Sequence, residues 1–218
     1  MFIGHFAIAF AAKRAAPAVS LGTLFLACQF ADLLWPNLVL AGVEHLAIAP
    51  GITAVTPLDF QSYPYSHSLL ALAVWAAIAA VLYKLLRGAT PLAAFLVVAG
   101  LVLSHWALDV ISHRPDMPLT IGGDTKLGLG LWNSRPATII VELVMLAAGL
   151  AMYVRATKPI DRTGMFALAG LVVFLLVINI ANMYGPPPPS ATAVAWSAQA
   201  VWLLVAWGYW IDGHRQRR

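Results

Sequence analysis

The sequence has few charged residues and a single cysteine. Charged residues make up 10% of the 218 residues, whereas a soluble domain usually carries about 25%. Cys28 stands alone, which excludes an internal disulfide and a cysteine-based zinc site. We expect it to be a small core residue. The net charge of +4 comes from lysines and arginines scattered in short loops, without a basic patch. Nucleic acid is therefore not an expected partner.

Hydrophobic residues make up 61% of the chain and come in long runs. A bilayer crossing takes about 20 such residues. We therefore predict an all-α, polytopic transmembrane helix bundle in the lipid bilayer, with one domain over residues 1–218. About six spanning helices are expected, at residues 20–48, 66–87, 91–112, 136–155, 163–184 and 190–212. Pro36 should kink or break the first of them. Asn133 or Ser134, followed by Pro136, is expected to cap the fourth.

The first fourteen residues, MFIGHFAIAFAAKR, predict a short N-terminal helix packed against the bundle. Lys13 and Arg14 follow the apolar run, whereas a signal peptide carries its basic residues before it. The run is also too short to cross a bilayer as a straight helix.

Lysines and arginines predict the orientation, because they favour the cytoplasmic side of a membrane. If the crossings alternate, one side holds ten of the 13: Lys13, Arg14, Lys84, Arg87, Arg155, Lys158, Arg162, Arg215, Arg217 and Arg218. We therefore expect a multi-pass protein of a bacterial-type inner (cytoplasmic) membrane with a cytoplasmic C-terminus. Residues 49–65, 113–135 and 185–189 then lie on the non-cytoplasmic side.

Ionisable residues inside apolar helices are costly, so each one is a functional candidate. His105 and Asp109 are four residues apart and share a helix face. They could bind one divalent ion together, or form a hydrogen bond between helices. His67 follows Ser66, a suitable helix N-cap; the alternative is an interfacial histidine without a ligand role.

Two further residues have the same pair of interpretations. His5 begins the short N-terminal helix and is either a ligand or a near-surface histidine. Asp32 lies in an apolar helix, where an ionised carboxylate needs a partner; the alternative is a structural hydrogen bond. In the predicted orientation both share one layer with His67, His105 and Asp109, toward the non-cytoplasmic face.

Three histidines and two carboxylates in one layer suit zinc, with manganese or iron as alternatives. A two-metal site with a shared carboxylate, for which we favour Asp109, would use all five. Glu142 falls in the same layer. His113, Arg114 and Asp116 follow at the helix exit; they are expected to support the ligands or bind substrate, or else to belong to a solvated loop.

The order of these motifs resembles the predicted inner-membrane metal-dependent hydrolases of the YdjM type. The resemblance covers residues 1–116: an N-terminal histidine, Asp32 in an apolar helix, Ser66-His67-Ser68, and His105-x-x-x-Asp109. That family is in turn similar to zinc-dependent phospholipase C, a helical bundle with metals among its helices. The resemblance implies that the metal ligands are His5, Asp32, His67, His105 and Asp109.

The sequence departs from the family pattern at three points. Tyr63-Pro64-Tyr65 replaces a His-Arg-Gly run, Asp32 replaces an Asp pair, and no His-x-x-x-Glu supplies further ligands. These departures favour one or two metal ions over three.

Together these observations predict a membrane-embedded metal-dependent hydrolase. Its expected substrate is a phosphoester, amphipathic or lipid-linked, attacked at the outer leaflet by metal-bound hydroxide. Asp32 and Asp109 are the expected catalytic carboxylates. The alternatives are a transporter or permease for a metal ion or small solute, and a non-catalytic protein with a structural metal site.

Overall fold

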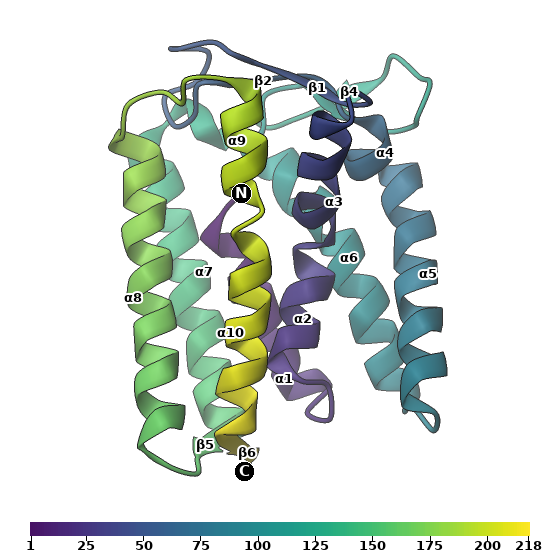
Figure 1. Ribbon diagram of the computed structural model, residues 1–218, viewed down its shortest axis with the longest axis vertical. Coiled ribbons are helices and arrows are strands. Elements are labelled where there is room, and N and C mark those ends of the chain that lie inside the picture. Colours follow the sequence, from purple (N-terminus) through teal and green to yellow (C-terminus); the bar gives the residue numbers. More distant parts are fainter.

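The computed structural model describes residues 1–218 as a nearly all-α bundle (Figure 1). This confirms the predicted fold class. Its helices are α1 (Ile3–Ala15), α2 (Leu21–Cys28), α3 (Phe30–Leu40), α4 (Pro64–His67), α5 (Leu69–Arg87), α6 (Leu92–Ser112), α7 (Arg135–Ala156), α8 (Arg162–Tyr184), α9 (Ala191–Ala198) and α10 (Val201–Gly213), with a short 3-10 helix at Leu131–Asn133.

Three short antiparallel strand pairs connect the helices. They are β1 (His45–Ile48) with β2 (Leu58–Ser62), β3 (Met117–Pro118) with β4 (Lys126–Leu127), and β5 (Thr157–Pro159) with β6 (Arg215–Arg217). The first two pairs lie at one end of the bundle, and the third lies at the opposite end, beside the C-terminus (Figure 1).

The helices have the length and composition of membrane spans. Five are long and apolar enough to cross a membrane, counting residues 191–213 as one, and a sixth results if α2 and α3 form one bent span. Their outward faces carry exposed apolar side chains such as Leu86, Val173 and Leu203. Because lipid is as apolar as a protein interior, these faces are consistent with a multi-pass membrane protein.

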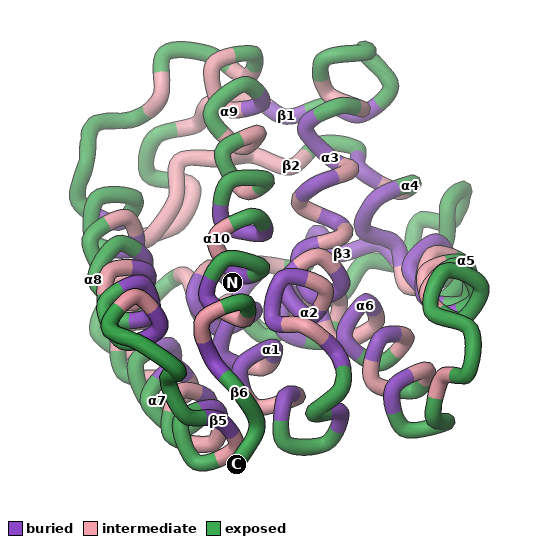
Figure 2. The backbone as a smooth tube through the Cα atoms, turned by 60° about the horizontal axis from the view of Figure 1, so that its bottom comes forward, coloured by how far each residue is buried: buried purple, intermediate pink, exposed green.

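The short helix α1 lies in the middle of the bundle (Figure 2). Its Phe6 and Phe10 are fully buried and pack edge-to-face on Phe25 of α2, with ring centroids 5.0 and 5.2 Å apart. On its other side α1 contacts α7, where a Cβ at Gly149 would lie 2.1 Å from the Ala7 carbonyl oxygen. Glycine therefore allows the close approach of these two helices.

The first predicted span differs from the structure. It breaks at Gln29, where α2 and α3 meet at 53°, and not at Pro36. Pro36 lies inside α3, and the Asn37 side-chain amide donates to the Leu33 carbonyl oxygen beside it, at 2.7 Å. The helix ends at Leu40, and residues 45–48 form β1 instead of its last turn.

The predicted capping of the second span is also corrected. Ser68, and not Ser66, caps α5, since its side chain accepts from the Ala71 amide. Ser66 belongs to the separate helix α4. The N-cap expected at Asn133 or Ser134 is Ser134, whose side chain accepts from the Ala137 amide. Residues 191–213 are divided into α9 and α10.

Candidate metal centre

The last turns of α6 present His105 and Asp109 on one face, with His113 immediately after the helix. The spacing of four residues places successive side chains one turn apart on the same side. All three side chains are buried and turn toward the bundle interior. The predicted stripe is therefore present, and it continues to His113.

Asp109 lies at the centre of four histidines, each of which turns its Nε2 atom toward this carboxylate. Oδ1 of Asp109 lies 3.1 Å from Nε2 of His5. Oδ2 lies 3.1 Å from Nε2 of His105, 3.9 Å from that of His67 and 4.0 Å from that of His113. The N-terminal amine of Met1 also contacts Oδ1. Residues from α1, α4 and α6 thus meet at one side chain.

Asp32 joins this cluster from the first turn of α3. Its Oδ1 lies 3.6 Å from Nε2 of His67 and 3.7 Å from Nε2 of His105. Two groups of side chains could hold a metal ion: His5, His105 and Asp109, and Asp32, His67 and His105. His105 belongs to both, and its Nε2 has one lone pair. It can therefore bind an ion in only one of the two groups at a time.

The break between α2 and α3 fixes the tautomer of His105. The last carbonyls of a helix have no partner within it, and the Cys28 carbonyl at the end of α2 accepts from Nδ1 of His105 at 2.7 Å. A carbonyl oxygen can only accept, so Nδ1 carries the proton. Nε2 is left as the lone pair that faces Asp32 and Asp109.

A chain of two hydrogen bonds fixes the tautomer of His67. The Ser66 hydroxyl donates to Oε2 of Glu44 at 2.6 Å and lies 2.7 Å from Nδ1 of His67. Because its one proton goes to Glu44, the hydroxyl accepts from Nδ1–H. Glu44 also accepts from the Tyr65 and Ser66 amides at the start of α4. Second partners of this kind orient histidine ligands in metal sites.

The tautomer of His113 is fixed in the same way, by the carboxylate of Asp116. Its Nδ1–H donates to Oδ1 of Asp116 at 2.9 Å, which also accepts from the buried Tyr63 hydroxyl at 2.9 Å. Burial would raise the pKa of Asp116, but its hydrogen bonds with His113, Tyr63 and Arg114 outweigh burial and hold that pKa below its usual value. Burial lowers the pKa of His113. A neutral imidazole with Nδ1–H leaves a lone pair on Nε2.

Glu142 positions His5 through the backbone. Its two carboxylate oxygens accept from the Phe2 and Ile3 amides at 3.1 and 3.0 Å, and so cap the start of α1. The His5 ring then stacks on that of His105, with centroids 3.9 Å apart and planes 4° from parallel. Nδ1 of His5 is buried without a hydrogen-bond partner.

These side chains fit a divalent metal ion. Three histidines have acceptors for Nδ1–H, so their Nε2 lone pairs converge on carboxylate oxygens that also carry lone pairs. Nε2 of His105 is buried with no hydrogen-bond partner, although Asp109 is 3.1 Å away. The Met1 ammonium contacts Oδ1 of Asp109, but it leaves the Nε2 lone pair of His105 without a donor, and a divalent cation would satisfy that lone pair. Imidazole nitrogens and carboxylate oxygens are the ligands that zinc prefers when no cysteine is present.

Asp32 lies on the one side of the cluster that is open to the surroundings. Its side chain is 35% exposed, whereas those of His67, His105 and Asp109 are 4% exposed or less. The sequence predicts a carboxylate well inside an apolar helix, but the break at Gln29 places Asp32 in the first turn of α3. A small ligand could therefore approach from this side.

Arg114 is the one predicted site residue that is turned away from the cluster. Its guanidinium contacts Asp59 of β2, and its Nε donates to Oδ2 of Asp116 at 3.1 Å. Its charge is thus paired with two carboxylates. Asp116 and Glu142 lie behind His113 and His5, where they support these histidines.

Four residues of the site were not predicted: Cys28 as a backbone acceptor, Glu44, Tyr63 and Ser66 as a hydrogen-bond donor. Only Glu44 gave a signal in the sequence, as an acid beside the end of an apolar segment. Comparison with known proteins finds no relative, since no family model, curated protein or solved structure gives a significant match.

Proposed function

We propose that this protein is a membrane-embedded, metal-dependent hydrolase of the YdjM type that acts on a phosphoester. The observation that carries the proposal is the convergence of four histidine Nε2 atoms on Asp109. Their Nδ1 atoms are held by Cys28, Ser66 and Asp116 in three of the four cases. Such support for metal-facing histidines is typical of metal centres.

The residues that would hold the ion are His105 with either Asp32 and His67 or His5 and Asp109. Zinc suits this set of nitrogen and oxygen donors; manganese and iron are the alternatives. A bound divalent ion would activate water and stabilise the charge that develops on phosphoryl oxygens. Both candidate groups share His105, which can bind only one ion, and this favours a single metal ion. A second ion would need Asp109 as a ligand shared by the two ions.

His113 would orient the reacting water. Its Nε2 lone pair lies 4.0 Å from Asp109 and can accept a hydrogen bond at the edge of the cluster. Asp116 keeps the proton on Nδ1 and so keeps this lone pair available. Asp32 and Asp109 remain the carboxylates that would touch the ion and the substrate.

The position of the cluster favours an amphipathic or lipid-linked substrate. His105 and Asp109 come from the candidate span α6, Asp32 comes from the bent pair α2 and α3, and the open side of the cluster is at Asp32. If the basic end of the bundle faces the cytoplasm, the C-terminus is cytoplasmic and the site serves the outer leaflet of an inner membrane.

The packing between the cluster and the basic end of the bundle argues against a transport pathway. Ion pathways through membranes are lined by polar groups along their length. Between His5 and the other end of α1 the interior is filled by Phe6, Phe10 and Phe25, all fully buried. A purely structural metal site is closed by protein ligands, whereas the partly exposed Asp32 leaves one side open.

The experiment that tests this function is elemental analysis of the detergent-purified protein beside a His105→Ala/Asp109→Ala double variant. We expect one or two equivalents of zinc or manganese in the wild type and none in the variant. His45→Ala, an exposed histidine outside the cluster, should keep its metal. The loaded protein should then hydrolyse phosphoester substrates. A wild-type protein that takes up no metal after reconstitution would exclude a metal-dependent hydrolase.

A further inference from the structure

A hollow between α8 and α10 lies at the basic end of the bundle, away from the metal centre. Its volume is about 430 Å³, and it is lined by Arg162, Thr163, Phe166, Ala167, Trp207 and Trp210. The hollow is shallow, and most of it is open to the surroundings.

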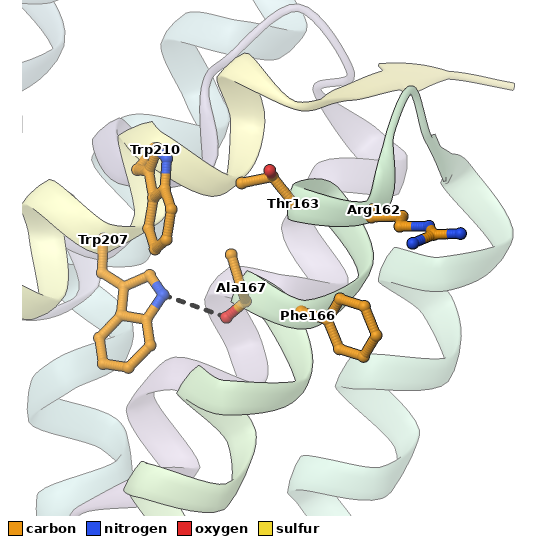
Figure 3. A pocket seen from close by; sticks show the side chains of 6 residues that line it. All are labelled: Arg162, Thr163, Phe166, Ala167, Trp207 and Trp210. Atoms are coloured by element: carbon orange, nitrogen blue, oxygen red, sulfur yellow. Dashed lines mark hydrogen bonds between the residues drawn. The ribbon is translucent and has the colours of Figure 1, made fainter.

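The two helices close the hollow on one side. Nε1 of Trp207 donates to the Ala167 carbonyl oxygen at 3.0 Å, which fixes the indole across the helices (Figure 3). Gly170, one turn further along α8, lies beside this ring: a Cβ there would be 3.4 Å from it, an ordinary contact distance. Trp210 and Phe166 form walls that are 51% and 64% exposed. The hollow is therefore apolar and open to the outer face of α8.

That outer face belongs to a candidate membrane span. Along α8, Phe166, Val173 and Val177 are each about 60% exposed. Tryptophans near a span end are typical of the membrane interface. An acyl chain could therefore reach the hollow directly from the bilayer.

Arg162 supplies an unneutralised charge at the rim. It lies one turn before Phe166, and both side chains project to the same side of α8, away from Trp207 and Trp210 (Figure 3). The two acids at this end are engaged elsewhere: Asp161 with His214 at 2.7 Å, and Asp212 with Lys13 at 2.9 Å. Arg162 itself forms no salt bridge, although the exposed carboxylate of Asp161 is its neighbour in the chain.

The charge around the hollow is positive as a whole. Ten of the 13 lysines and arginines lie at this end or close to it, but only Asp161 and Asp212 of the nine acids. Basic residues at a membrane surface attract anionic lipids. The apolar hollow matches the acyl chains of such a lipid, and the guanidinium at its rim matches the anionic headgroup.

We propose that this hollow binds one anionic phospholipid, with its phosphate at Arg162 and an acyl chain against Phe166, Trp207 and Trp210. The site is separate from the proposed hydrolase centre. It would hold α8 against α10 as a structural lipid. Thr163 lines the hollow on the side of Trp210 (Figure 3).

Native mass spectrometry and thermal unfolding of the whole detergent-purified protein test this. The probes are phosphatidylglycerol and phosphatidylcholine with identical chains, and the variants are Arg162→Gln, Trp210→Ala and Lys158→Gln. The wild type should retain one phosphatidylglycerol and be stabilised by it more than by phosphatidylcholine. Arg162→Gln should bind phosphatidylglycerol about fivefold more weakly, as expected for the loss of one cation beside an anionic headgroup.

The controls distinguish binding at this hollow from a general attraction of anionic lipids to the basic end of the bundle. Lys158→Gln removes an exposed cation at the same end that does not line the hollow, and should leave the affinity unchanged. Trp210→Ala should weaken binding of both lipids. Equal losses in Arg162→Gln and Lys158→Gln, or equal binding of the two lipids by the wild type, would overturn the proposal. Metal content should be the same in all variants.

Discussion

The Ser66 hydroxyl donates a hydrogen bond of 2.6 Å to the Glu44 carboxylate, across 22 residues of sequence. This bond uses the one hydroxyl proton of Ser66, so that the oxygen must accept from His67. A buried acid in the loop after α3 thus determines which nitrogen of His67 faces the candidate metal centre.

Glu44→Gln should weaken metal binding by about ten- to a hundredfold, the usual effect of losing a residue that supports a metal-binding histidine. The amide keeps one acceptor for the Tyr65 and Ser66 amides, but its NH₂ group cannot accept from the Ser66 hydroxyl. Competition with a chromogenic chelator measures the affinity. Ser66→Ala should have a similar effect, whereas His45→Ala, an exposed neighbour, should have none. An unchanged affinity in Glu44→Gln would remove Glu44 from the site without contradicting the proposed metal centre.

Asp116→Asn should lower hydrolysis more than metal affinity. Its amide can present an NH₂ group to Nδ1 of His113, so that the ring can carry its proton on Nε2 and lose the lone pair that would orient water. His113→Gln should match it, with the metal retained. Turnover of a phosphoester and metal content, measured on the same preparations, separate the two effects. Loss of metal in either variant would instead make His113 a ligand.

Gly149→Ala should destabilise the bundle and weaken metal binding together. The new Cβ would lie 2.1 Å from the Ala7 carbonyl oxygen, and forcing an extra group into a packed interior typically costs about 1–3 kcal/mol. Since α1 carries His5, its displacement should also disturb the cluster. Thermal unfolding in detergent and elemental analysis measure both.

Gly100→Ala is the matched control, because Gly100 lies inside α6 with nothing within 4 Å of its added Cβ. It should be neutral or stabilise the protein by up to about 1 kcal/mol, as glycine is a poor helix residue. Similar losses in both variants would mean that helix propensity, and not the contact between α1 and α7, is responsible.

The long spans and the layer of polar residues could be predicted from the sequence, because hydropathy and helical spacing are local properties. Asp109 and His105 share a face of α6 whatever surrounds them. The break at Gln29 could not be predicted, since Pro36 gave the stronger local signal and the tertiary contact between Cys28 and His105 is not visible in the sequence.

The residues that support the histidines were missed for the same reason. Glu44 and Tyr63 lie in connecting segments with no helical period. Their roles depend on how the loop between α3 and α4 folds back over α6, which brings Glu44 to Ser66 and Tyr63 to Asp116. Long-range hydrogen bonds of this kind leave no spacing rule to read.

Lys13 and Asp212 form the other buried polar contact of α1, at the end opposite His5. Nζ of Lys13 donates to both Asp212 oxygens at 2.9 Å and to the Val19 carbonyl at 2.8 Å. Lys13→Met leaves a mostly buried carboxylate unpaired, which in fully buried pairs costs about 3–5 kcal/mol. Because Asp212 is 17% exposed, we expect a loss of stability near the lower end of this range, seen as a reduced unfolding temperature.

Lys13→Met/Asp212→Leu should regain most of the lost stability, since apolar replacements of buried pairs are often neutral. Metal content should stay at the wild-type level in both variants, because Phe6 and Phe10 separate this pair from His5. Loss of metal in the double variant would show that the two ends of α1 are coupled.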